Sequence, residues 1–293
     1  MRRSPEGTMP PTRQPTLLAV LAHPDDESLG VGGTLARYAA TGVEVHLVTA
    51  TRGDAGRWRG VRPGQTGHPG AQALGAIRAS ELREAAAALG VKEVSLLEHP
   101  DGRLDAVEPR QAIAGIVRHL RRVRPDVVVT FGPDGAYGHP DHIAISQLTT
   151  AAVMAAADPA FTFDGTQAAG STHAVRKLYY LAWPASTWAA YEAAIGSPTS
   201  TIDGVSRRAL PWPDWAITTV VDTRAFWPLV STAIACHVSQ VSAYERLTHV
   251  TPEHHEALWG TQSFYRAFSL VNGGRVRETC LFDGITDRLP HTP

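Results

Sequence analysis

The sequence predicts an α/β fold: a Rossmann-like, open and mostly parallel sheet with helices on both faces, plus a C-terminal α+β elaboration packed on it. Over the first half of the chain, short and almost continuous apolar runs alternate with longer segments of helical character. Such apolar runs are typical of parallel strands buried on both faces. Right-handed crossovers between these strands produce the Rossmann-like arrangement.

Each expected strand of the first half is a short apolar run, and a helix or a long loop follows it. The expected strands are residues 17–22, 43–50, 94–97 and 126–131. The expected helices are residues 28–40, 78–89, 109–123 and 143–157. Ser28 is a suitable N-cap for the first helix, and Gly42 stands just past its end. Residues 52–76, rich in glycine and arginine, form a long loop of the kind that tends to be functional or mobile.

The strand–helix alternation is lost after residue 157. Strands are expected over 177–183 and 217–221, and a helix over 224–240. Residues 1–14, rich in Pro, Arg and Ser, are expected to be a disordered leader. Residues 15–157 are then expected to form a Rossmann-like core, which the loops described below make metal-binding, and residues 158–293 a C-terminal elaboration of the same domain.

Composition argues against several classes of function. The 293 residues contain 27 Lys and Arg against 28 Asp and Glu, so no nucleic-acid partner is expected. The two cysteines, Cys236 and Cys280, argue against a disulfide scaffold and a cysteine-rich zinc site, and they favour a reducing cytoplasm. No apolar run approaches the length of a membrane span, so no membrane partner is expected.

Two polar loops follow the first and fourth expected strands. The first contains His23, Asp25 and Asp26, and the second, residues 135–142, contains three more charged or imidazole side chains. Because parallel strands end at the same edge of a sheet, both loops are expected to meet there. His23 and Asp26, with one histidine of the second loop, supply three N/O ligands and leave a fourth position open, as in catalytic zinc sites.

The two loops together resemble a known family. Ala22-His23-Pro24-Asp25-Asp26-Glu27 and His139-Pro140-Asp141-His142 are similar to the zinc-dependent N-deacetylases of the LmbE/PIG-L family, especially its mycothiol-related deacetylase and amidase branches. The resemblance covers roughly the first half of the chain well and a few later segments more loosely. It implies a hydrolase that removes an N-acetyl group from an amino-sugar conjugate by metal-activated attack of water.

The resemblance also implies metal ligands and catalytic groups. The implied ligands of one Zn²⁺ per subunit, with Fe²⁺ as a further candidate metal, are His23, Asp26 and His142. Asp25 would be the general base, although another carboxylate such as Glu27 stays open. His139 would stabilise the oxyanion or protonate the leaving amine, with Asp141 holding its charge state.

Four further residues match less specific positions of the family. Tyr137 would lie near the oxyanion, and Arg78, Asp101 and His237 would contact the substrate. Each also has a structural interpretation: a packed aromatic ring, a solvated charge, an Asx turn and a core histidine, respectively. The expected partner is a small-molecule amino-sugar or acyl-amine substrate, and a homo-oligomer is compatible with the sequence.

Departures from the family pattern affect the substrate more than the reaction. Cys236 stands where relatives often have alanine, and Asp54 stands where they usually have glutamate. Cleavage of a larger acyl or thiol-conjugate amide is therefore the alternative activity. A non-catalytic nucleotide-binding module is less favoured, because Leu35 occupies the place of the third glycine of a dinucleotide fingerprint that would begin at Gly30. The acidic first loop would also repel a pyrophosphate.

Overall fold

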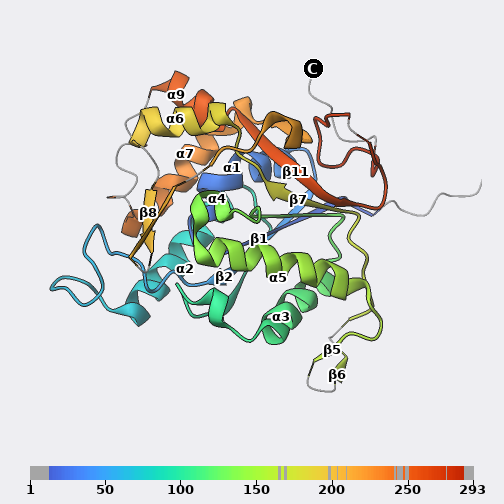
Figure 1. The fold of residues 1–293 in the computed structure, drawn as a ribbon, viewed down its shortest axis with the longest axis horizontal. Helices are drawn as coiled ribbons and strands as arrows, with labels where there is room; N and C mark the ends of the chain where they lie inside the picture. Colours follow the sequence, from blue (N-terminus) through green and yellow to red (C-terminus); the bar gives the residue numbers. More distant parts are fainter. Residues whose placement is uncertain are drawn as a thin grey trace, which may run out of the picture.

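A computed structural model describes residues 13–163, 166–167, 170–196, 199–202, 204–208, 210–240, 242, 247, 251–274 and 276–286. The expected disordered leader falls mainly on residues 1–12, which lie outside the described part. The centre of the molecule is a seven-stranded sheet with helices on both faces, as the sequence predicts (Figure 1). No helix of the described part is both long and apolar enough to cross a membrane.

Six of the seven strands run in one direction. The strand order is β10-β11-β7-β4-β1-β2-β3, and β11 is antiparallel to both of its neighbours. The bounds are β1 (Thr16–Leu21), β2 (Glu44–Thr51), β3 (Glu93–His99), β4 (Val127–Thr130), β7 (Lys177–Leu181), β10 (Thr219–Asp222) and β11 (Thr261–Ser269). Three of these strands come from residues beyond 158, and they belong to the same sheet as the first four.

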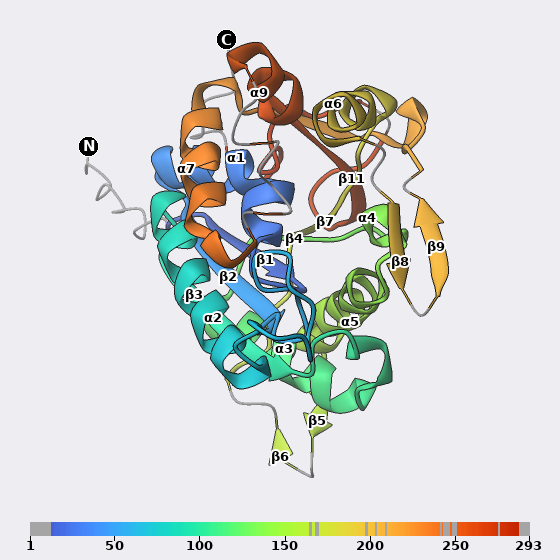
Figure 2. The same ribbon diagram turned by 90° about the vertical axis from the view of Figure 1, so that its left-hand side faces the viewer.

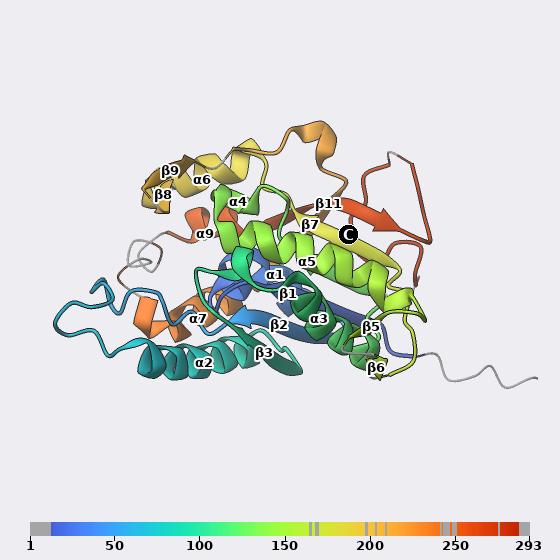
Figure 3. The same ribbon diagram turned by 60° about the horizontal axis from the view of Figure 1, so that its bottom comes forward.

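Helices cover the two faces in separate groups (Figures 2 and 3). One group contains α1 (Asp26–Ala40), α2 (Ala71–Ala88) and α7 (Trp227–Cys236), and the other contains α3 (Pro109–Val123) and α5 (Pro140–Ala157). The remaining helices and hairpins are α4 (Gly135–Gly138), α6 (Ala185–Ile195), α9 (Pro252–Trp259), β5 (Thr162–Phe163) with β6 (Thr166–Gln167), and β8 (Thr199–Ile202) with β9 (Val205–Arg208). Among the described residues, four single 3₁₀ turns are Leu104–Ala106, Asp214–Ala216, Arg224–Phe226 and Val238–Gln240.

Strand β1 lies near the middle of the sheet because its side chains after Thr16 are apolar on both faces. All six of its residues are buried. Leu17 pairs with Val45 of β2 on one side and with Val127 of β4 on the other. A strand that is covered by helices on both faces needs this unbroken apolar pattern. In a sheet with one face in solvent, apolar and polar residues instead alternate along each strand.

Proline and capping side chains define where the two helices of the second face begin. Pro109 follows Glu108, whose carboxylate accepts hydrogen bonds from the backbone N–H groups of Arg110 and Gln111. Pro140 follows His139, whose Nδ1 accepts a hydrogen bond from the N–H of Asp141. In both cases proline occupies the first helical position, where a missing N–H costs nothing.

The structure corrects several expected boundaries. Helix α1 begins at Asp26 rather than at Ser28, and Asp25 is its N-cap with a φ angle of 113°. Helix α2 begins at Ala71, seven residues before the expected start at 78, and α7 ends at Cys236 rather than at 240. Strand β11 was not expected, because five of its nine residues are only partly buried and the apolar run is interrupted by Arg266.

The buried carboxylate of Glu278 joins the C-terminal strands near the amino ends of β7 and β10, away from the two polar loops. Glu278 accepts hydrogen bonds from Lys177 Nζ (2.7 Å), Tyr179 OH (2.6 Å) and Thr219 Oγ1 (2.8 Å), which stand on β7 and β10. Arg266 and Asn272 also donate to it, at 2.7 and 2.6 Å. The Lys177 side chain is completely buried, so its charge depends on this carboxylate.

We expect Glu278→Ala to lower the free energy of unfolding by about 3–5 kcal/mol, because the substitution leaves the Lys177 ammonium buried without its counter-charge. Chemical denaturation measures this change. Lys92→Ala removes an exposed ion pair with Glu44 and should cost less than about 1 kcal/mol. Equal losses in the two variants would contradict the assignment of Glu278 as a buried anchor.

Candidate active site

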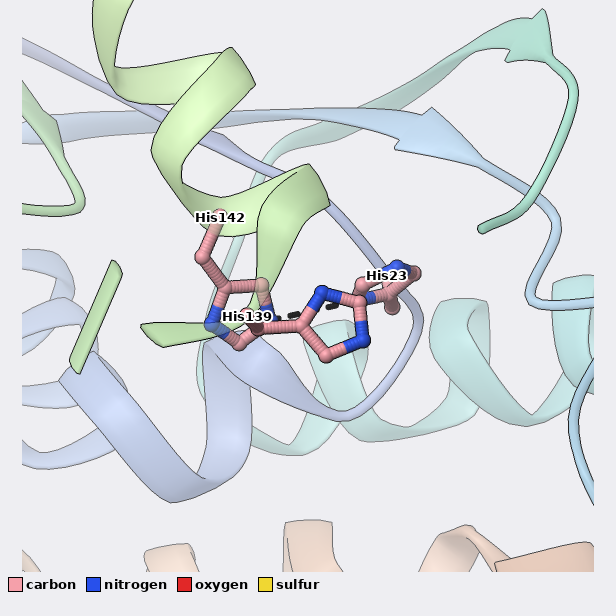
Figure 4. Close-up of side chains that lie close together, drawn as sticks. All are labelled: His23, His139 and His142. Carbon is pink, nitrogen blue, oxygen red and sulfur yellow. Dashed lines mark hydrogen bonds between the residues drawn. The ribbon is translucent and has the colours of Figure 1, made fainter. Parts of the chain in front are cut away.

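The candidate site lies at the carboxyl ends of β1 and β4, where the order of the parallel strands reverses direction. From β1 the chain continues to β2 and β3 on one side, and from β4 it continues to β7 on the other. Open α/β sheets form a crevice at this point. His23 follows β1, while His139 and His142 stand at the start of α5, so the three rings point toward one another (Figure 4).

Three donor groups converge as in a metal site. His23 Nδ1 lies 3.2 Å from His142 Nε2, and His142 Nε2 lies 3.3 Å from Asp26 Oδ1. His23 Nδ1 lies 3.7 Å from the other oxygen of Asp26. Ligand atoms about 2.0–2.1 Å from a tetrahedral metal are about 3.3 Å apart. All three side chains are buried, and His142 stacks on Phe131 with ring centroids 3.9 Å apart.

A second carboxylate layer holds His23 from its other side. His23 Nε2 lies 3.1 Å from Asp141 Oδ2 and 3.2 Å from Asp101 Oδ1. The fully buried Asp141 also accepts the backbone N–H groups of Gly102 and Leu104. A histidine that binds a metal through one nitrogen usually donates its other N–H to a carboxylate, which fixes the tautomer and the ring orientation.

This contact corrects the expected pairing of Asp141 with His139. The carboxylate of Asp141 faces His23, and only its backbone N–H reaches His139. The reason is that His139 and Asp141 belong to the N-cap and first turn of α5, and residues two apart on a helix do not share a face. Asp101 uses one oxygen for His23 and the other for the N–H of Ala55 (2.8 Å). It also lines the cavity, so its expected contact with substrate stays a prediction.

The charges around His23 favour a cation at this position. Burial opposes a charged imidazole, but the hydrogen bonds to Asp101 and Asp141 and the charge of Asp26 outweigh it and raise the pKa of His23 to about 10. Burial also opposes the ionised form of Asp26, yet the charges of His142 and His23 lower its pKa below the usual range. Three carboxylates therefore surround one imidazole, and their excess negative charge suits a divalent metal ion.

His139 has a different electrostatic environment. Burial and the nearby charges of His142 and His23 outweigh the attraction of Asp141 and Asp26 and lower the pKa of His139 to about 3. The ring is therefore neutral near pH 7. Because its Nδ1 accepts the N–H of Asp141, the proton of the neutral ring is on Nε2. One nitrogen of His139 also lies within 4.8 Å of a nitrogen of His23 and of His142, which makes it a second candidate for the third ligand.

Arg78 holds Asp25 beside the three donor groups of His23, Asp26 and His142. Arg78 Nη2 lies 3.1 Å from Asp25 Oδ2 and donates to Pro24 O at 2.5 Å, and its Nη1 donates to Gly53 O at 2.7 Å. Gly53 has a φ angle of 64°, and any side chain there would collide with the Arg78 guanidinium. Arg78 was expected to contact the sugar. It does line the cavity, but these hydrogen bonds fix the loop that carries Asp25.

His237 lies away from the cavity, contrary to its expected contact with substrate. Its ring is 1% exposed, and Nε2 lies 2.7 Å from Glu27 Oε1. Burial disfavours the charged ring, but the charge and hydrogen bond of Glu27 raise the pKa of His237. His237 is absent from the residues that line the described cavity. It stands just past the end of α7, whereas the sequence placed it within a helix.

The donor group opens into a cavity of about 600 Å³. Part of its lining is polar and contains His23, Asp25, Asp26 and His142. Another part is aromatic, and we define this aromatic wall as Trp183, Trp188 and Tyr191. Trp183 stacks on Tyr191 with ring centroids 5.3 Å apart and meets Trp188 edge-on at 4.8 Å.

Tyr137 lines the cavity and contacts both the polar group and the hydrophobic cluster of the aromatic wall. Its ring lies 5.4 Å from the His142 ring, and it also contacts the hydrophobic cluster that contains Trp188. Burial and the charges of Asp26 and Asp25 raise the pKa of its phenol, which therefore stays protonated and can donate a hydrogen bond.

Sequence reasoning missed the aromatic wall. Trp183 stands two residues past the last residue of β7, and a position at the carboxyl end of a parallel strand is a signal that could have found it. Trp188 and Tyr191 stand on α6, whose position over the cavity is set by packing against α9 and cannot be derived from the local sequence.

The fold and the site are those of a hydrolase with a His/Asp metal-binding group. The model of the family described as "PIG-L: GlcNAc-PI de-N-acetylase" matches residues 18–153, the part that carries both polar loops. Together with relatives that match most of the chain, this match shows that the chain belongs to the PIG-L family of N-deacetylases. The enzyme class expected from the sequence is confirmed, in preference to a non-catalytic nucleotide-binding module.

Curated relatives match over most of their length. A 1D-myo-inositol 2-acetamido-2-deoxy-alpha-D-glucopyranoside deacetylase of Kineococcus radiotolerans is 34% identical over 310 residues, covering 92% of this chain and 82% of the relative. The enzyme of the same name from Rhodococcus jostii is 38% identical over 246 residues, with 77% and 82% coverage. That of Geodermatophilus obscurus is 35% identical over 288 residues, with 91% and 95% coverage.

Solved structures confirm the fold. A conserved protein from Thermus thermophilus aligns with a TM-score of 0.60 and 25% identity, covering 89% of this chain and 98% of that protein. The N,N'-diacetylchitobiose deacetylase from Pyrococcus horikoshii aligns with a TM-score of 0.62 and 22% identity, with 86% and 83% coverage.

We expect Asp141→Asn to weaken the binding of a divalent metal by about 10- to 100-fold, because the substitution removes a carboxylate that orients His23. Competition with a chromogenic chelator measures the affinity. Asp105→Asn, which changes an exposed carboxylate in the same region, serves as the control. An Asp141→Asn protein with unchanged affinity would show that His23 does not need this contact.

Proposed function

We propose that this protein removes the acetyl group from the N-acetylglucosaminyl part of an inositol conjugate, with one zinc ion held by His23, Asp26 and His142. The observation that carries the proposal is the convergence of these three donors, 3.2–3.7 Å apart, in the lining of a cavity. The curated relatives, named as deacetylases of 1D-myo-inositol 2-acetamido-2-deoxy-alpha-D-glucopyranoside, support the substrate.

Asp26 is favoured over His139 as the third ligand for two reasons. Its Oδ1 lies 3.3 Å from His142 Nε2, which is the separation of two ligands of one tetrahedral metal, and its charge offsets that of a divalent ion, whereas a third imidazole adds none. A zinc ion in this position would lower the pKa of a water molecule and polarise the amide carbonyl of the substrate. The remaining steps depend on side chains of the chain itself.

Asp25 is the group best placed to accept the proton of the attacking water. Its carboxylate lines the cavity next to Asp26, and Arg78 holds one of its oxygens at 3.1 Å. Glu27, the other carboxylate of the loop, does not line the described cavity. After the attack, the proton on Asp25 can pass to the amine nitrogen as the C–N bond breaks, so that acetate and a free amine leave.

His139 and Tyr137 are suited to stabilise the oxyanion. Both line the cavity, and both are neutral donors near pH 7: the lowered pKa keeps the His139 ring uncharged, and the raised pKa keeps the Tyr137 phenol protonated well above neutral pH. A neutral His139 with its proton on Nε2 favours the oxyanion role over protonation of the leaving amine. A divalent cation beside the ring acts in the same direction, since it lowers the pKa of His139 further.

The size and lining of the cavity suit a conjugate larger than a single sugar. A cavity of about 600 Å³ exceeds the space that one N-acetylhexosamine needs, and apolar walls with a few polar groups are usual in small-molecule sites. With the acetamide at the polar part of the lining, the second ring of the substrate would face the aromatic wall. We further propose that the enzyme works in the cytoplasm, because both Cys236 and Cys280 are free thiols.

The first test of this function is deacetylation by protein that has been stripped of metal and reloaded with one equivalent of zinc. We expect release of acetate and free amine from N-acetylglucosaminyl-inositol, and no release before reloading. His142→Ala should retain no zinc after dialysis, because only two of the three donors remain. Full zinc occupancy in this variant, measured by plasma emission spectroscopy, would remove His142 from the ligand set.

The pH dependence of the rate separates the two functions of His139. A pKa near 3 keeps the ring neutral above pH 5, so neither limb of a kcat profile between pH 5 and 9 should come from it. His139→Ala should lower kcat by about 10²- to 10³-fold at every pH, the usual loss for one oxyanion donor. Disappearance of the basic limb in His139→Ala would instead identify this residue as the general acid.

The aromatic wall is tested by Trp188→Leu. We expect KM for the inositol conjugate to rise by about 2- to 10-fold, because one aromatic contact contributes about 0.5–1.5 kcal/mol. KM for N-acetylglucosamine, which lacks the second ring, should stay the same. Trp215→Leu, an exposed tryptophan outside the cavity lining, is the control. Equal effects on both substrates would place the second ring elsewhere.

A further inference from the structure

The proposed base, Asp25, stands in a backbone conformation that a non-glycine residue rarely adopts. Its φ and ψ angles are 113° and −25°. Such a conformation persists only where the surrounding structure holds it, and it is often found at functional sites. The Arg78 contacts described above hold the side chain of Asp25 and the preceding carbonyl. The Asp25 carbonyl accepts the backbone N–H groups of Ser28 and Leu29 at 3.1 and 3.0 Å, and a further group holds the Asp25 N–H.

That group is the carboxylate of Glu27, which turns back onto the loop. Its Oε2 accepts the backbone N–H of Asp25 at 2.9 Å. Its Oε1 lies 2.7 Å from His237 Nε2 and accepts the hydroxyl of Ser28 at 2.5 Å. The Glu27 side chain has no exposed surface, and each oxygen is engaged by a neighbour. Glu27 therefore has no path to substrate and is not placed to act as a base.

His237, the partner of Glu27, comes from a distant part of the chain that packs against α1. His237 is 210 residues further along, just past α7. Helix α7 approaches α1 at Gly32, where an added Cβ would lie 3.3 Å from Val230. The backbone N–H of His237 also donates to Ile234 O at 3.1 Å, which fixes the residue at the end of α7. The close packing of the two helices thus sets the position of the imidazole behind Glu27.

We propose that Glu27 and His237 form a buried brace that holds Asp25 in its left-handed conformation and so aims its carboxylate into the cavity. On this view both are positioning residues, since neither lines the cavity and Glu27 acts through the Asp25 backbone. The proposal rests on the proposed function in one respect only, namely that Asp25 is the base. The C-terminal part of the chain then contributes to catalysis through His237 as well as through the aromatic wall.

Kinetics of Glu27→Ala and Glu27→Gln test the brace. We expect Glu27→Ala to lower kcat about 10- to 100-fold, the range usual for residues that orient a catalytic group, while KM and zinc content stay within twofold of wild type. Glu27→Gln should lose much less, because its amide oxygen still accepts the Asp25 N–H. His237→Ala should resemble Glu27→Ala. Equal losses for alanine and glutamine would overturn the proposal.

A double-variant comparison separates positioning from general stabilisation. In an Asp25→Asn background the base is already absent, so Glu27→Ala should cause no further loss of kcat beyond twofold. A loss that adds fully to that of Asp25→Asn would show that Glu27 does not act through Asp25. Glu278→Gln, which perturbs the buried carboxylate at the far edge of the sheet, is the matched control: it should lower the melting temperature and leave kcat unchanged.

The crystal structure of Glu27→Ala provides a readout that does not depend on activity. We expect the φ angle of Asp25 to become negative and its carboxylate to turn away from Asp26. A Glu27→Ala structure with Asp25 unchanged would overturn the brace, even if the proposed deacetylation is correct. If Glu27→Ala does not fold, the structure of His237→Ala answers the same question. A wild-type protein without deacetylase activity would contradict the proposed function and leave this structural test intact.

Discussion

The site depends on one imidazole held between two sets of charges. His23 meets Asp26 and His142 at its Nδ1 and meets Asp101 and Asp141 at its Nε2. Burying this many charges is unfavourable unless they are paired, so each contact constrains the others. The loops after β1, β3 and β4 must all arrive at this ring in register. The polar part of the cavity, and the enzyme chemistry that it permits, follow from that arrangement.

The structure divides the polar residues of the site into those that face the cavity and those that hold them. Asp25 and His139 have access to the cavity, whereas Asp141 and Glu27 are buried and accept hydrogen bonds from the loops. Arg78 belongs to both groups, since it lines the cavity and also fixes Pro24 and Gly53. A mutational scan that measured activity alone would not separate these groups. Measurements of metal affinity and of backbone conformation would separate them.

The parallel part of the fold could be predicted because its strands are apolar on both faces, and the carboxyl-edge rule then brings the two polar loops together. What could not be predicted is the direction of individual side chains. Asp141 is two residues from His139 in sequence, yet the first turn of α5 turns its carboxylate toward His23. His237 was expected near the substrate because of its sequence pattern, but the end of α7 directs it to Glu27.

The later half of the chain was less predictable for a physical reason. Strand β11 is only partly buried and runs antiparallel, so its residues lack the apolar run that marks β1 or β4. Trp188 and Tyr191 form part of the cavity only because α6 packs against α9, a contact between segments about 65 residues apart, well beyond the reach of local patterns. Tertiary packing, rather than local sequence, therefore determines the part of the cavity where substrate selection is proposed.

The most direct test of this account is anomalous X-ray diffraction at the zinc edge from crystals of the protein loaded with one equivalent of zinc. The account predicts a single anomalous peak within bonding distance of His23 Nδ1, His142 Nε2 and the Asp26 carboxylate. A peak on the opposite side of His23, between Asp101 and Asp141, would contradict it, as would a peak bound by His139 in place of Asp26.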